Sequence, residues 1–314
     1  MSECWRQAML TIGQLLCCMQ PNKHRREAYI PNEFENNSKI NTNMAASVLF
    51  ICGLTDKVLP KFVHISEEAN MDGSFLFSCL LRDRLRITNT GTVLVCLQQN
   101  FQHYFNAGMR LGYNAKIFLD RILNVVDPLT DMAQKGMKSK WLRDERLITT
   151  YILNDICEYI SETADQRVST TIMIDNLAVL LNLGATKEEI LQLCYQLVDL
   201  PKQYDNLSVI TKISNCDLNE AIDNNLAKLS NAHIRVAPFK TPVSRVADGK
   251  LLIQREALYQ KARQEDEQGR VQEIDDREKR IVCAEVMYKA HSRCVKIMFP
   301  CELEDHSDKN KCYV

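Results

Sequence analysis

The sequence has no excess of positive charge, no close cysteine pairs and no long apolar run. Its 39 basic and 40 acidic residues give a net charge of −1, so any nucleic-acid contact would need a local basic patch. The 13 cysteines are scattered without C-x-x-C spacing, which predicts free thiols in a reducing compartment rather than disulfides. Those expected to be buried are Cys79, Cys96, Cys157 and Cys194. No run is long enough to span a membrane, so no membrane partner is expected.

One segment has the position of a phosphate-binding loop but lacks the residues that bind phosphate and magnesium. The segment containing D-G-S-F-L follows a predicted strand and opens a helix, where a P-loop NTPase carries G-x-x-x-x-G-K-[ST]. With the second glycine aligned on Gly73, Glu68 stands at the first glycine, Ser74 at the lysine and Phe75 at the hydroxyl. The cation that meets the phosphates and the magnesium ligand are therefore both absent. Glu67 and Glu68 would also repel a phosphate, so no catalytic residue and no cofactor is expected.

Parts of a nucleotide site nevertheless remain. Gly73 supplies the tight turn, and the helix N-terminus after it could bind an anion through backbone N–H groups. The alternative is that Asp72 and Ser74 only cap the helix. The apolar run T-T-I-M-I ends in Asp175 and resembles the strand that carries a magnesium-binding aspartate, or Asp175 only accepts hydrogen bonds there. The predicted vestigial nucleotide site is Asp72, Gly73, Ser74 and Asp175.

Strand and helix signals alternate along most of the chain, which predicts an α/β fold with a mainly parallel sheet and helices on both faces. The order of the loop and the acid-ended strand favours a RecA-like core. The last two strands leave no room for a helix between them and should pair antiparallel at one edge. The expected strands are 61–66, 92–97, 117–120, 170–174, 207–213, 233–237, 250–255, 282–289 and 293–299.

Helices are expected between the earlier strands. Residues 74–86 and 141–162 carry apolar residues at helical intervals, and Leu147 belongs to the second stripe. Thr186 and Glu189 form a capping box for a helix that Pro201 should end. Asp217 is expected to cap a further helix in the same way.

The chain divides into one folded region and two tails. Residues 44–302 are expected to form the RecA-like domain, within which 260–280 is a densely charged, solvated insertion or ragged helix. Residues 1–43 resemble neither the rest of the chain nor a clear targeting signal, and we interpret them as an appended, disordered tail. Residues 303–314 form a C-terminal tail.

One basic run in the folded region surrounds an aromatic residue. A base could stack on Trp141 while the neighbouring cations contact phosphates. Alternatively, the run is a solvated helix start with Trp141 packed on the core, because Asp144 and Glu145 dilute the charge. The candidate RNA-binding residues are Lys135, Lys138, Lys140, Trp141, Arg143 and Arg146.

The six histidines do not indicate a metal site. His291 and Cys294 are separated by two residues, a spacing that loosely resembles zinc ligands, but we attribute it to chance. No metal is therefore predicted.

Several segments carry a family resemblance in order and spacing. They are M-D-G-S-F-L with G-T-V-L-V-C-L, Q-N-F-Q-H-Y with L-G, and I-M-I-D-N-L with V-L-L-N-L-G, with weaker echoes at V-A-D-G-K-L and in the last strands. Together they resemble the Elongator subunit 6 family over about residues 44–302. This resemblance implies a RecA-like fold without a working P-loop, a ring of six built with Elongator subunits 4 and 5, and support of wobble-uridine modification in tRNA.

We therefore expect a non-catalytic ring subunit that contacts tRNA through the assembled ring, in the cytoplasm and also the nucleus. Two alternatives stay open at this point. The chain could be an atypical RecA-like ATPase, which ATP binding would reveal. It could also be a recombination-type regulator with other partners, which a pull-down would reveal.

Overall fold

The computed structural model describes residues 44–143, 147–163, 166–239, 247–260, 277–291 and 294–298. The expectations for residues 1–43, 303–314 and most of the charged insertion lie outside these residues. The insertion's two ends are strand residues, because β7 runs to Gln260 and β8 begins at Arg277.

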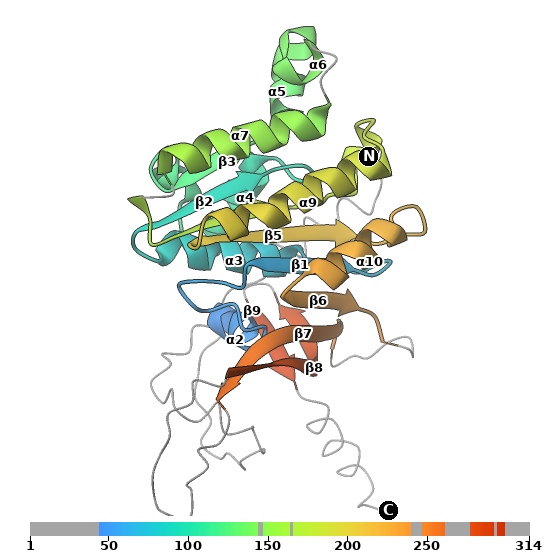
Figure 1. The fold of residues 1–314 in the computed structure, drawn as a ribbon. Coiled ribbons are helices and arrows are strands. Elements are labelled where there is room, and N and C mark those ends of the chain that lie inside the picture. Colours follow the sequence, from blue (N-terminus) through green and yellow to red (C-terminus); the bar gives the residue numbers. More distant parts are fainter. Residues whose placement is uncertain are drawn as a thin grey trace, which may run out of the picture.

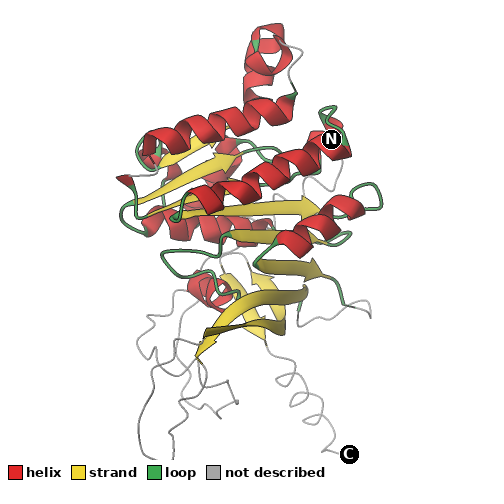
Figure 2. Cartoon of the chain, viewed as in Figure 1, coloured by secondary structure: helices red, strands yellow, loops and turns green. Residues whose placement is uncertain are grey.

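A nine-stranded sheet in the order β3-β2-β4-β5-β1-β6-β7-β8-β9 forms the centre of the described residues (Figures 1 and 2). All strands from β3 to β6 in this order are parallel, while β7 pairs antiparallel with β6, β8 with β7 and β9 with β8. The predicted antiparallel edge is confirmed. The strands are β1 (Phe62–Glu67), β2 (Thr90–Val95), β3 (Leu123–Val126), β4 (Ser169–Ile174), β5 (Leu207–Ser214), β6 (Ala232–Ala237), β7 (Gly249–Gln260), β8 (Arg277–His291) and β9 (Cys294–Met298).

Helices cover both faces of the parallel strands. One face packs against α2, α3 and α4, and the other packs against α7, α9 and α10. The helices are α2 (Met44–Ile51), α3 (Ser74–Arg86), α4 (Phe101–Arg110), α5 (Pro128–Lys135), α6 (Lys140–Arg143), α7 (Ile148–Thr163), α8 (Val179–Asn182), α9 (Lys187–Gln203) and α10 (Glu220–Leu229), with 3-10 turns η2 (Ala115–Phe118) and η3 (Gly136–Lys138). None of the described helices is long and apolar enough to cross a bilayer.

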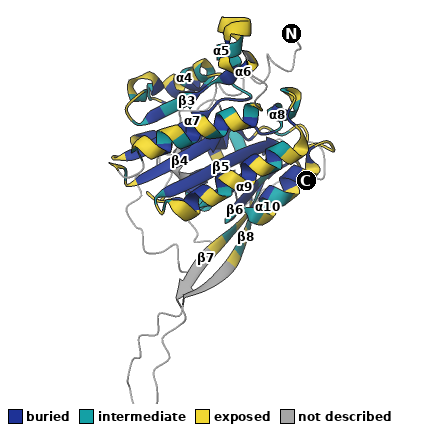
Figure 3. Ribbon diagram, turned by 45° about the horizontal axis from the view of Figure 1, so that its top comes forward, coloured by how far each residue is buried: buried dark blue, intermediate teal, exposed yellow. Residues whose placement is uncertain are grey.

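The central strands are buried on both sides, as Figure 3 shows. Every residue of β1, β2 and β4 is buried, which is the pattern of a parallel sheet between two helical layers. Of the cysteines expected in the core, Cys79, Cys96 and Cys194 are buried free thiols and Cys157 is half-buried.

Five local expectations are wrong. Residues 117–120 do not form a strand, because η2 occupies this stretch and β3 follows at Leu123–Val126. The single helix over 141–162 is two helices, α6 and α7. Leu147 lies between them, with 45% of its surface exposed, rather than on the buried stripe.

The other two errors concern helix ends. Pro201 lies inside α9, which continues to Gln203, since a proline in the last turn removes few helical hydrogen bonds. The capping box of α9, formed by Thr186 and Glu189, is confirmed. The N-cap of α10 is Asn219, not Asp217, and the Asn219 side chain instead accepts a hydrogen bond from the Cys216 N–H.

Candidate functional site

The turn between β1 and α3 lies at the carboxyl ends of the parallel strands, where ligands bind in open α/β sheets. Asp72 stabilises this turn, because its Oδ1 accepts a hydrogen bond from the Ser74 N–H at 2.8 Å. Gly73 has a negative φ of −95°, so its backbone conformation in the turn does not require glycine. A Cβ there would crowd its neighbours, since it would lie 3.0 Å from Val236 and 3.2 Å from the Glu67 carboxylate.

The Glu67 carboxylate fills the anion position of the turn. Its Oε1 accepts a hydrogen bond from the Gly73 N–H at 2.8 Å, and its Oε2 accepts one from the Ser214 hydroxyl at 2.6 Å. Glu67 does not simply face the approach of a phosphate, as its sequence position suggested. Its side chain turns inward and is 3% exposed, so the chain's own carboxylate uses the donors that a phosphate would need.

A buried lysine completes this arrangement. Lys212, in β5, places its Nζ 2.7 Å from Glu67 Oε1, and its side chain is 1% exposed. The same Nζ lies 3.1 Å from Gln98 Oε1 and 3.4 Å from Ser74 Oγ. The cation that is missing from the loop is therefore supplied by a neighbouring strand, where it neutralises Glu67.

Sequence reasoning missed Lys212. The available signal was a lysine inside the otherwise apolar and hydroxyl-bearing strand L-S-V-I-T-K-I-S, because an unpaired lysine is almost never fully buried. Its partner could not be identified without the strand register. Ile65 pairs with Lys212 and Glu67 with Ser214 in the parallel β1–β5 ladder, which brings the two charges together.

Asp175 holds the segment that follows β2. Its carboxylate accepts hydrogen bonds from the backbone N–H groups of Leu97, Gln98 and Gln99 at 2.7–3.0 Å, and from the Tyr104 hydroxyl at 3.0 Å. Burial raises the pKa of this carboxyl, while the backbone donors oppose the rise. Four donors occupy the acceptor positions of a carboxylate, so a metal ion would have to displace a hydrogen bond.

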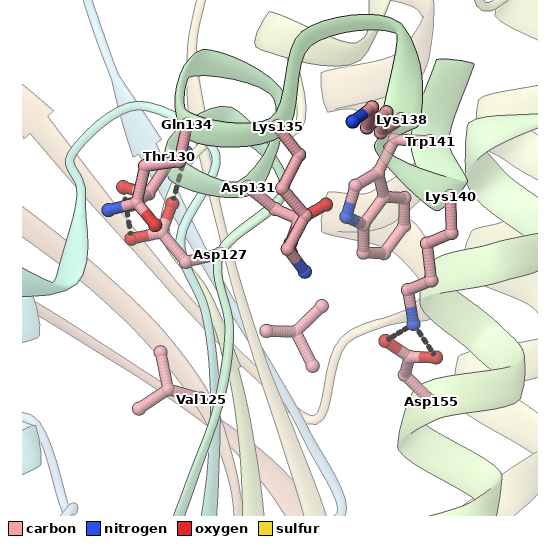
Figure 4. Close-up of a pocket in the computed structure, with 11 residues that line it drawn as sticks. Val125, Asp127, Thr130, Asp131, Gln134, Lys135, Lys138, Lys140, Trp141 and Asp155 are labelled. Carbon is pink, nitrogen blue, oxygen red and sulfur yellow. Dashed lines mark hydrogen bonds and ion pairs between the residues drawn. The ribbon is translucent and has the colours of Figure 1, made fainter. Parts of the chain in front are cut away.

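The basic run lines a separate cleft of about 1070 Å³ beside the end of β3 (Figure 4). Acidic residues share this cleft: Lys140 binds Asp155 at 2.6 Å, and Lys135 forms an ion pair with Asp131. Lys138 also lines the cleft, and no ion pair of its side chain is seen within the described residues. Arg146 lies outside those residues, as does the side chain of Arg143.

Trp141 is packed in the core rather than presented to solvent. Its side chain is 8% exposed and meets Tyr151 edge to face at 5.7 Å. Lys140 Nζ lies 4.7 Å from the centre of the indole ring. Trp141 lines the cleft together with Lys135, Lys138 and Lys140. A base could not stack on its ring without displacing Tyr151 or Lys140, because little of the ring is exposed.

Solved structures share this fold. The KaiC-like protein PH0186 from Pyrococcus horikoshii OT3 superimposes with a TM-score of 0.50 and 7% identity, over 77% of this chain and 91% of that chain. The uncharacterized protein PH0321 from Pyrococcus horikoshii, solved with an unknown peptide, gives a TM-score of 0.52 and 11% identity, over 80% and 96%. The RecA-like architecture expected from the sequence is confirmed.

Sequence comparison identifies the family. A family model described as Elongation complex protein 6 matches residues 52–274. Elongator complex protein 6 of Drosophila melanogaster is 47% identical over 262 residues, which cover 83% of this chain and 98% of that protein. A match that extends over most of both chains is far more specific than the shared fold. The chain therefore belongs to the Elongator complex protein 6 family.

Proposed function

We propose that this chain is a non-catalytic RecA-like subunit of the Elongator complex. The observation that carries the proposal is the Glu67 carboxylate in the anion position of the β1–α3 turn, paired with Lys212. A nucleotide phosphate would have to displace a buried ion pair and would gain no loop lysine in return. The names of the family and of the Drosophila relative supply the link to Elongator.

Its partners in this proposal are Elongator subunits 4 and 5, in a ring of six. The ring would hold tRNA for modification of wobble uridines, in the cytoplasm and also the nucleus. The family resemblance supports these partners and this role, and the buried free thiols fit a reducing compartment. The cleft that contains Lys138 is the proposed site of tRNA contact.

Co-purification tests the assembly. The tagged chain, expressed with subunits 4 and 5, should elute from a sizing column with both, at the mass of a six-membered ring. Capture of neither subunit, or capture of recombination proteins instead, would overturn the proposal.

ATP binding tests the non-catalytic role. Calorimetric titration of the purified chain with Mg-ATP should show no saturable heat, because the phosphate donors are already occupied. Tight binding that disappears in Asp175→Ala would instead identify an atypical ATPase in which this aspartate holds magnesium.

A further inference from the structure

A second buried polar cluster lies on the opposite face of β1 from Glu67. It consists of His64 in β1, His233 in β6 and Asp223 in α10, which are 0%, 8% and 2% exposed. One nitrogen from each imidazole and one carboxylate oxygen lie within 4.8 Å of one another. Three elements, β1 and the consecutive α10 and β6, therefore bring metal-ligating atoms close to a common point.

Hydrogen bonds connect these groups through Ser66. The Ser66 Oγ lies 2.5 Å from Asp223 Oδ1 and 2.7 Å from His233 Nε2, and His64 Nε2 lies 2.9 Å from the same Asp223 oxygen. The protons can be assigned completely: His64 and Ser66 donate to Asp223, and His233 donates to Ser66. With both imidazoles neutral, this assignment leaves the cluster with one negative charge.

Burial favours these protonation states. It lowers the pKa of His64 and lowers the pKa of His233 to about 4. Burial also raises the pKa of Asp223, but hydrogen bonds from His64 and Ser66 outweigh it and leave this pKa below its usual value. Neutral imidazoles and an ionised carboxylate are the forms that bind metal ions.

Within the described residues, no cationic side chain lies beside this negative charge. Asp223 accepts a hydrogen bond from the neutral His64, and in the same part of the chain no lysine or arginine reaches its carboxylate. Buried charges in proteins are paired or coordinate metals, because an isolated one is costly to remove from water. Glu67, on the other face of the same strand, is paired with Lys212, whereas the Asp223 charge lacks such a partner.

We propose that His64, His233 and Asp223 bind a zinc ion that ties α10 to the sheet. Two imidazoles and one carboxylate suit zinc better than magnesium or calcium, which prefer oxygen ligands. Zinc bonds of about 2.0–2.1 Å fit ligand atoms this close together after small side-chain movements. The Ser66 hydroxyl, or a water that replaces it, would be the fourth ligand.

The surrounding residues fit the same assignment. On binding, each imidazole proton moves from Nε2 to Nδ1, which frees both Nε2 atoms for the metal; the His64 proton then faces the Thr211 hydroxyl at 2.8 Å. The Asn215 amide donates to Asp223 Oδ2 at 3.0 Å and holds the carboxylate in place. Partners that orient the ligands in this way are typical of metal sites. Since the three ligands are buried, the ion would stabilise the fold rather than meet a substrate.

Metal titration of the full chain tests the proposal. After treatment with a chelator, the protein should take up one Zn²⁺ per chain with a rise in its unfolding temperature. Co²⁺ should give the intense visible bands of a four-coordinate site. His64→Gln and His233→Gln should each abolish this signal, while the matched control His103→Gln should retain it.

Thr211→Val supplies a variant that keeps all three ligands. It should fold and bind zinc about 10–100-fold more weakly, because it loses the group that orients His64. If the wild-type chain takes up no more zinc than His233→Gln, or if Co²⁺ shows only the weak spectrum of the hydrated ion, the cluster is a hydrogen-bond network alone and the proposal fails.

Discussion

A buried carboxylate lies on each side of β1, and the two differ in how their negative charge is balanced. His64 and Ser66 point to the side covered by α10, and Glu67 points to the side covered by α3, as alternation along a strand requires. On the α3 side, Lys212 neutralises Glu67 within the chain. On the α10 side, the donors of Asp223 are neutral groups, so its charge remains. The charge of Glu67 is therefore balanced without a ligand, whereas the charge of Asp223 could be balanced by a bound cation.

The largest effect on stability is expected from breaking the ion pair between Glu67 and Lys212. Lys212→Met leaves the Glu67 carboxylate buried without its cation and should destabilise the fold by about 3–5 kcal/mol. The measurement is urea unfolding at neutral pH. Lys202→Met is the matched control, because Lys202 contacts Asp199 at 2.6 Å on the exposed surface, where an ion pair contributes about 0–1 kcal/mol.

A double variant sharpens this result. Glu67→Gln combined with Lys212→Met removes both charges and should recover most of the stability lost by Lys212→Met alone. If the two substitutions simply add, Glu67 and Lys212 are not coupled, and the description of this face as a balanced pair is wrong.

The cluster on the α10 side should make the stability of the fold depend on pH. In chelator-treated protein, the folded pKa of His233 is about 4 against the ordinary 6.5, so between these values the unfolded chain binds the extra proton. Stability should therefore fall as the pH drops through this window, by about 2 kcal/mol between pH 6.5 and pH 5. His233→Gln should reduce this slope in urea unfolding, and the part that remains should come from His64, whose pKa burial also lowers. An unchanged slope would assign the titration to another group.

A smaller effect is expected when an external anion is added after Glu67 has been removed. Glu67→Ala frees the Gly73 N–H, the Ser214 hydroxyl and Lys212, which together form a vacant anion site. Millimolar inorganic phosphate or formate should then raise the unfolding temperature of the variant but not of the wild type. Glu68→Ala removes the adjacent carboxylate and should show no such response. An equal response in both variants would indicate a general salt effect.

The sequence predicted those helices and strands whose signal lies within a few neighbouring residues. Eight of the nine expected strands are present, because runs rich in β-branched and aromatic residues mark strands of either direction. β3 was missed since it is only four residues long and contains Asn124, while the more apolar stretch before it forms a 3-10 turn. Thr186 and Glu189 were identified as a cap because both partners lie within one helical turn.

The sites were harder to predict because their partners are distant in sequence. Glu67 and Lys212 are 145 residues apart, and His64 and Asp223 are 159 apart. Their contacts depend on which strands are neighbours and on the register between them. The sequence showed that the loop had lost its lysine, but only the β1–β5 pairing reveals that a lysine from another strand neutralises the carboxylate now in that position.

The smallest expected effect concerns the exposed cleft, where the charges are largely balanced in pairs. Lys140 and Lys135 are each bound to an aspartate, so reversing them would also break an ion pair. Lys138→Glu is the cleaner test of tRNA contact by the assembled ring. If Lys138 contacts one phosphate, the slope of log affinity against log salt should decrease by about one unit, with the ring intact on a sizing column. Gln134→Glu, in the same cleft, is the control for added negative charge without loss of a lysine. Equal effects of the two variants would mean that the cleft acts only through its general potential, and no effect of either would exclude it from the tRNA interface.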